Sequence, residues 1–172
     1  MGLWKPPAKV MLPSEHDDAP SLFEYNGHLP DGTQLLAYLC PDPAGYLPAD
    51  ESGKIGYRCF GVVHEFDADG HHRLVRTRVI SGRSAGVTES ADPGEAMFRE
   101  MVAPYLAAGW RPGNIWVRPF LVDIDGWPHG FVFRAYGEGL EGGGEEEPEE
   151  DVYFMPFNFP FHPPYDSGSY ST

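Results

Sequence analysis

The motif Asp-x-Asp-Gly occurs twice in this chain, at residues 67–70 and 123–126, and each copy separates two runs of strand-forming residues. Asp-Gly is a favoured centre for a two-residue hairpin turn, because both central positions must tolerate a positive φ. Turn chemistry explains the shared motif without an internal repeat. We therefore predict two antiparallel hairpins, and the fold must contain an antiparallel sheet.

The first predicted hairpin joins residues 55–66 to residues 72–80. In the returning strand, Val75 and Val79 share one parity while Arg76 and Arg78 share the other, so the two pairs lie on opposite faces of the sheet. The strand over residues 55–66 carries apolar residues at both parities. We expect both of its faces to be covered.

The second predicted hairpin joins residues 114–124 to residues 130–136, and Pro119 marks its first strand as an edge strand or as the site of a bulge. Residues 152–159 predict a last strand that a proline also interrupts. Residues 33–40 are apolar at both parities, so they fit a buried strand as well as a short helix.

The clearest helix signal begins at Asp92. Asp92 suits the N-cap, Pro93 suits the first helical position, and Glu95 lies where a capping box places its acid. An apolar stripe at helical spacing follows, made by Met97, Phe98, Met101, Val102 and Tyr105. Pro104 predicts a kink, and Gly109 suits the left-handed position that ends a helix.

Together these elements predict an α+β fold, with an antiparallel sheet built from two hairpins plus a C-terminal strand and one main helix packed on one face. A chain of 172 residues predicts a single domain over residues 1–172. Within it we expect an extended N-terminal arm, an acidic flexible loop and a Pro/aromatic C-terminal tail, at residues 1–30, 138–151 and 155–172. The tail either docks on its own core, which we favour, or presents a polyproline segment to a partner.

The charge balance limits which molecules can approach this chain. It carries Asp+Glu 26 against Lys+Arg 12, a net charge of −14, and eight of the acids lie between Glu138 and Asp151. Such a surface repels phosphate backbones and anionic lipid and attracts basic proteins. We therefore expect no nucleic-acid partner and no membrane partner, but another protein with a basic surface.

The expected compartment follows from the N-terminus and the cysteines. Residues 1–7 lack the apolar stretch of a signal peptide, and no window approaches the roughly 18 apolar residues of a membrane span. We therefore expect a cytoplasmic protein, in which Cys40 and Cys59 are buried thiols rather than a disulfide. The oligomeric state stays open.

Motifs for metals and catalysis are weak. A calcium loop fails in both Asp-x-Asp-Gly copies, because the fifth and twelfth positions carry no carboxylate. Histidines gather at His64, His71 and His72, and Asp67, His72 and His129 could meet and bind a transition metal if the two hairpins packed side by side. No zinc spacing accompanies them. Cys59 and His64 lie at odd spacing on one strand and face opposite ways. We predict no metal site, no cofactor and no catalytic residue, and a binding protein rather than an enzyme.

The one concentration of positive charge suggests an anion site. Arg76, Arg78 and Arg83, with the nearby Ser81 and Ser84, lie before the helix N-terminus and could bind carboxylate or phosphate. The commoner alternative is that these arginines pair with the chain's own surplus carboxylates.

Three hypotheses of function follow. The leading one is a protein-binding or inhibitory protein, of the immunity type, that recognises a basic partner surface. Its partner-binding candidates are acidic residues of the loop, namely Glu145, Glu146, Glu147, Glu149, Glu150 and Asp151. A solvated loop is the simpler interpretation of the same acids. The alternatives are a small enzyme or anion-binding domain that uses the arginine cluster, and a structural subunit of a larger assembly.

Overall fold

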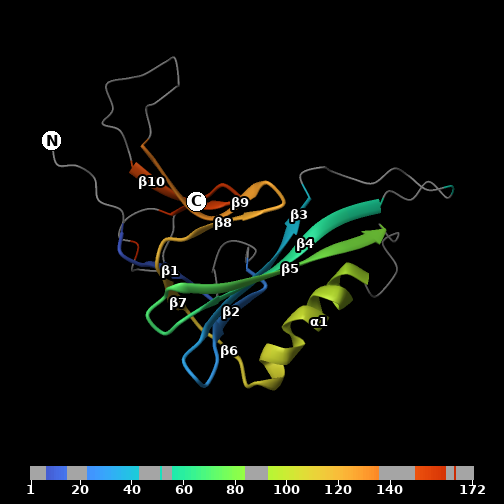
Figure 1. Cartoon of the computed structure of the whole chain (residues 1–172), viewed down its shortest axis with the longest axis horizontal. Coiled ribbons are helices and arrows are strands. Elements are labelled where there is room, and N and C mark those ends of the chain that lie inside the picture. Colours follow the sequence, from blue (N-terminus) through green and yellow to red (C-terminus); the bar gives the residue numbers. More distant parts are fainter. Residues whose placement is uncertain are drawn as a thin grey trace, which may run out of the picture. The chain divides into compact units, whose positions relative to one another are not determined.

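The structure is a computed structural model of the chain, and it describes residues 7–14, 23–42, 51, 56–83, 93–135, 150–161 and 165 (Figure 1). The chain divides into two compact units. Unit 1 contains Met1–Met11 and Trp116–Thr172, and unit 2 contains Leu12–Ile115. The organisation as a single domain stays a prediction.

Unit 2 contains an antiparallel sheet of five strands in the order β5-β4-β3-β2-β6. The strands are β2 (Tyr25–His28), β3 (Gln34–Pro41), β4 (Gly56–Phe66), β5 (His72–Arg83) and β6 (Arg111–Pro112). Residues 33–40, which fitted a strand or a helix equally, form the strand β3. Leu35, Leu36, Ala37 and Tyr38 are all buried, so successive side chains on both faces are covered. This explains the lack of alternation in the sequence.

The predicted first hairpin is confirmed as β4 and β5, but its turn is one residue longer than expected. The amide of Asp67 donates to the carbonyl of His71 at 3.0 Å, and the amide of Gly70 donates to the carbonyl of Asp67 at 2.9 Å. Gly70 has a φ of 85°, and it is the position in this turn with a positive φ. A type I turn followed by a left-handed glycine is the usual three-residue hairpin loop, so the expected two-residue turn is wrong here.

The helix α1 (Pro93–Ala107) packs on one face of the five-stranded sheet (Figure 1). The buried core between them consists of Leu35, Ala37, Cys59, Val63, Ile80, Phe98, Val102 and Tyr105. Gly61 lies below the helix, where an added Cβ would be 2.7 Å from the sulfur of Met101. The helix ends as predicted: Gly109 has a φ of 90°, and the amide of Trp110 donates to the carbonyl of Tyr105 at 3.0 Å.

Unit 1 contains an antiparallel sheet of four strands in the order β11-β10-β9-β8. They are β8 (Leu121–Ile124), β9 (Trp127–Ala135), β10 (Glu150–Met155) and β11 (Phe159–Phe161). The turn between β8 and β9 is the predicted two-residue one, since Asp125 and Gly126 have φ values of 53° and 84°. The predicted last strand is two strands, β10 and β11, with Pro156 between them.

Aromatic side chains fill the core of unit 1. The ring of Phe131 lies 5.3 Å from that of Phe154 and 5.7 Å from that of Phe161, measured between centroids. Phe161 belongs to the predicted tail and is 1% exposed. The described part of the tail therefore packs on its own unit, as edge-to-face aromatic contacts favour.

Two details of the expected sheet are corrected by the structure. The two hairpins lie in different sheets rather than in one. The predicted strand over residues 114–124 is divided into β7 (Ile115–Val117) and β8, and Pro119 lies in the break because it has no amide for a strand ladder. β7 pairs with β1 (Val10–Leu12) in a two-stranded sheet. The coarser prediction, an α+β fold with mostly antiparallel sheet and a single helix in the described residues, is confirmed.

No helix in the described ranges combines the length and the apolar character that crossing a membrane requires.

Gly27 of β2 is required by a close approach of two backbones. A Cβ at this position would lie 2.0 Å from the carbonyl oxygen of Arg111 in β6, and backbone cannot move aside as a side-chain tip can. We expect Gly27→Ala to lower the free energy of unfolding by about 1–3 kcal/mol. The matched control is Gly113→Ala, where the nearest atom, in His28, is 3.4 Å away; it should stay within about 0.5 kcal/mol. Urea unfolding of both variants tests this, and equal losses would contradict it.

Candidate functional site

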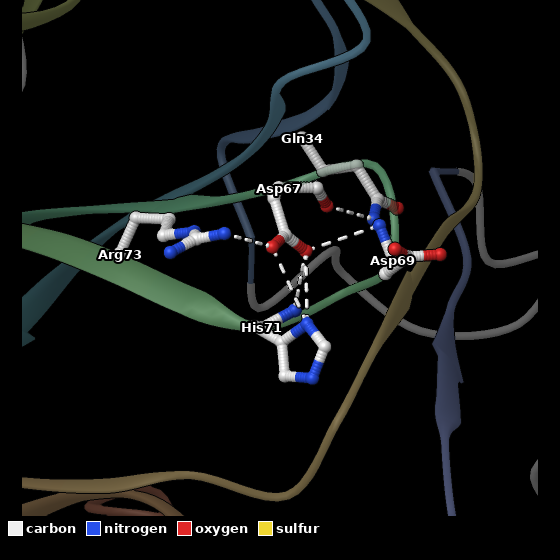
Figure 2. A network of polar contacts seen from close by, with 5 residues as sticks. All are labelled: Gln34, Asp67, Asp69, His71 and Arg73. Carbon is white, nitrogen blue, oxygen red and sulfur yellow. Dashed lines mark hydrogen bonds and ion pairs between the residues drawn. The ribbon is translucent and has the colours of Figure 1, made fainter.

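Asp67 organises the end of the β4–β5 hairpin (Figure 2). One carboxylate oxygen, Oδ1, accepts from the amides of Asp69 at 3.0 Å and His71 at 2.8 Å, and Oδ2 accepts from Nη2 of Arg73 at 2.6 Å. The backbone carbonyl of Asp67 accepts from Nε2 of Gln34 at 2.9 Å. The hydrogen bond from the His71 backbone and the Arg73 guanidinium lower the pKa of the Asp67 carboxyl to about 2. Asp67 therefore stays ionised and closes the turn.

The same chemistry recurs at the β8–β9 turn, where Oδ1 of Asp123 accepts from the amide of Gly126 at 2.9 Å. The first aspartate of each Asp-x-Asp-Gly motif is thus an acceptor for backbone amides. Its conformational role explains why the motif occurs at both hairpins.

The arginines of β5 contact carboxylates of the same chain. Nε of Arg76 lies 3.6 Å from Oε1 of Glu65, and Nη1 of Arg78 lies 3.0 Å from Oε2 of Glu100 on α1. Register places both arginines on the face of the sheet that α1 covers, because Arg76 pairs with Val63 of the buried core. An anion would have to compete with these two glutamates.

The other residues of the predicted anion site are described less fully. Ser81 and Arg83 form the end of β5, of which the structure describes the backbone, and Ser84 lies outside the described residues. The anion site therefore stays a prediction.

Tyr105 also contacts Glu65 and Arg76, and this contact was not predicted from the sequence. Its hydroxyl donates to Oε1 of Glu65 at 2.5 Å, and the guanidinium carbon of Arg76 lies 6.0 Å from the centre of its ring. Burial, followed by the hydrogen bond to Glu65, raises the pKa of Tyr105 to about 12. Nothing in the sequence joins these three residues, because the contact depends on how the helix crosses the strands.

A chain of polar contacts runs through the opposite face of the same sheet. The hydroxyl of Tyr38 lies 2.9 Å from Nε2 of His64, and Nδ1 of His64 lies 3.1 Å from Nε2 of His72. Tyr38 and His64 are fully buried. Burial lowers the pKa of His72 and raises that of Tyr38 well above its usual value, so these two groups are neutral near pH 7.

Within unit 2, the neighbouring residues His71 and His72 contact different partners. His72 lies beside His64, whereas Nδ1 of His71 lies 3.3 Å from the carboxylate of Asp67. His129 belongs to the other unit. Among the described residues no set of three His, Cys, Asp or Glu side chains is placed to hold a metal ion.

The two thiols are buried and unbonded to each other, as predicted. Cys59 faces α1 within the core, and Cys40 pairs in register with Phe60, so the two cysteines lie on opposite faces. Burial is the main cause that raises the pKa of Cys40 to about 12. A thiol that stays protonated at neutral pH is a poor nucleophile.

Of the six predicted partner-binding acids, the structure describes the backbone of two. Glu145, Glu146, Glu147 and Glu149 are outside the described residues. Glu150 and Asp151 begin β10, where their backbones pair with those of Ala135 and Arg134.

Comparisons with protein-family models, with curated proteins and with solved structures found no match to this chain. Function is therefore inferred from the residues and their geometry alone.

The role of Asp67 can be separated from that of its neighbour Asp69, whose side chain makes no hydrogen bond within the described residues. We expect Asp67→Ala to lower the urea midpoint of unfolding, because two amides and Arg73 lose their acceptor. Asp69→Ala removes the same charge from the same turn and should leave the midpoint nearly unchanged. Equal effects of the two substitutions would show that charge, and not hydrogen bonding, is what matters at this turn.

His129 makes stability depend on pH. It is 1% exposed, and burial lowers its pKa from 6.5 to about 4. The unfolded chain therefore binds a proton on this histidine at a higher pH than the folded chain does. The contribution of neutral His129 to the free energy of unfolding is complete above pH 6.5 and is lost as the pH falls toward 4. The loss should reach about 3 kcal/mol. His129→Gln should be less stable at pH 7, yet lose less between neutral and acidic pH, as measured by urea unfolding across pH. Parallel profiles would rule this out.

Proposed function

We propose that this chain is an acidic protein-binding or inhibitory protein, of the immunity type, that recognises a basic surface on another protein. The observation that carries the proposal is a surplus of carboxylates that the chain's own cations cannot neutralise. Even if all 12 Lys and Arg residues were paired, 14 of the 26 Asp and Glu residues would have no cation in this chain.

Pairing within the described residues is already extensive. Five arginines contact carboxylates, in the pairs Arg58–Asp42, Arg73–Asp67, Arg76–Glu65, Arg78–Glu100 and Arg99–Glu95. Each pair removes one charge of each sign, so the net charge of −14 is unchanged. The cations are held locally, and the field at longer range is set by the remaining acids.

Some of these acids gather at one end of the sheet of unit 2. Asp31 lies in the turn between β2 and β3, and Asp69 lies in the turn between β4 and β5; both are exposed. The two turns are neighbours, because a Cβ at Gly32 would lie 3.5 Å from the Cβ of Ala68. Hydrogen bonds from Thr33 lower the pKa of Asp31, so it is ionised at neutral pH.

Complementary charge mainly accelerates encounter and selects partners, which is what an inhibitor of a basic protein needs. The alternative of an anion-binding domain gains no support from Arg76 and Arg78, because each already contacts a glutamate. Burial likewise keeps the Cys40 thiol and the His72 ring neutral near pH 7, so neither is an activated nucleophile or a charged acid.

The salt dependence of binding tests the proposal. The immobilised full chain would capture its partner at low salt, and elution by NaCl followed by mass spectrometry would identify it. We expect the dissociation constant of the purified pair to rise about tenfold or more between about 0.05 M and about 0.5 M NaCl, because salt screens exposed charges. An affinity that does not change with salt, or a partner with an acidic surface, would overturn the proposal.

Charge-matched variants then test whether the loop carries the contact. E145Q, E146Q and E147Q together remove three charges from the loop, whereas E24Q, E51Q and D125N together remove three from exposed positions elsewhere. We expect the loop triple variant to lose more affinity for the captured partner, through a slower association rate. Equal losses would place recognition in the overall field and not in the loop.

A further inference from the structure

β5 is the edge strand of the five-stranded sheet: β4 pairs with one side of it, and no strand of the described residues pairs with the other. It runs from His72 to Arg83, twelve residues without a proline. An edge strand of this length presents unpaired amides and carbonyls that favour pairing with another strand.

The residues of this edge read nearly the same in both directions. Leu74, Val75 and Arg76 precede Thr77, and Arg78, Val79 and Ile80 follow it. An antiparallel strand runs in the reverse direction, so such a sequence matches itself about its central residue. We propose that two copies of this chain pair through β5 as an antiparallel dimer, with the two-fold axis at Thr77.

The proposed register brings like side chains together. Val75 of one copy lies opposite Val79 of the other, and Thr77 lies opposite itself, all on the face away from α1. Val79 is 42% exposed and Leu74 is 39% exposed. The described residues include five large apolar side chains that are exposed, and these are two of them. Pairing covers them, because opposed β-branched and aliphatic side chains pack well across antiparallel strands.

Charge does not prevent this pairing locally. Arg76 of one copy would lie opposite Arg78 of the other, and like charges in that position repel. However, Glu65 lies 3.6 Å from Arg76 and Glu100 lies 3.0 Å from Arg78, so each arginine has its own carboxylate. Each of these four arginines of the dimer is therefore accompanied by a glutamate of its own copy.

A second copy suits this edge better than an unrelated strand. A two-fold interface requires that the same surface complement itself, and near-palindromic order about one residue has that property. An unrelated strand would need no such symmetry in β5.

The long-range charge gives the dimer a salt dependence opposite to that of the partner complex. Two chains of −14 each repel, so added salt strengthens the dimer, whereas salt weakens binding to a basic protein. The failure of one proposal in its salt titration would therefore leave the other proposal unaffected.

Sedimentation equilibrium of the full chain tests for the dimer. We expect the average mass to rise from 19.1 kDa toward twice that value as protein concentration and NaCl increase. A mass of 19.1 kDa at all concentrations and salt levels would overturn the proposal.

Disulfide trapping tests the register. Opposed residues of antiparallel strands have Cα atoms about 4.5–5.5 Å apart, within the range of a disulfide. Thr77→Cys should therefore form a disulfide-linked dimer on mild oxidation. Leu74→Cys, exposed on the same strand but opposite Ile80 of the second copy, should not, and the native cysteines are buried. Equal trapping at both positions, or none at Thr77→Cys, would contradict the register.

A charge at the axis tests the contact without oxidation. Thr77→Lys places two lysines opposite each other in the dimer and should abolish it in sedimentation. Ala103→Lys adds the same charge at an exposed position of α1 and should leave it intact. Circular dichroism of both variants confirms that they fold, and a dimer that survives Thr77→Lys would overturn the proposal.

Discussion

The register between β4 and its two neighbours is the constraint on which the rest of unit 2 depends. Side chains alternate between the faces of a strand, so a slip of one residue would move every side chain to the wrong face. The observed register places Cys59 and Val63 under α1 and His64 on the opposite face. The core, the ion pairs of β5 and the contact between His64 and His72 all follow from this single alignment.

Local pairing and overall charge act at different ranges in this molecule. The contact of Arg78 with Glu100 ties β5 to α1, and that of Arg73 with Asp67 closes a turn. Such contacts act over a few ångströms and cancel in the sum. The remaining carboxylates act over roughly the screening length of about 8–10 Å, which is the range at which an approaching protein first meets the surface. In the proposed function, the same residue types therefore serve both the folded structure and the recognition of a partner.

Local signals in the sequence were the most reliable guides to the fold. The Asp-Gly turns, and the glycine that ends the helix, depend on φ preferences that each residue carries with it. Prediction was weaker wherever a neighbour decided the outcome. Residues 33–40 fitted two structures until the sheet covered both of their faces. Pro119 predicted an irregularity between β7 and β8, but the placement of β7 with β1 in one sheet and of β8 in another was a matter of long-range pairing.

The sequence by itself determined the net charge, the position of the hairpin turns and the limits of the helix, because these are properties of single residues or of close neighbours. Only the tertiary structure decided that Arg76 contacts Glu65, that Tyr105 joins them, and that His64 lies beside His72. These partners are distant in the chain or lie on different elements. Their meeting depends on strand register and on the crossing of α1, which no local pattern encodes.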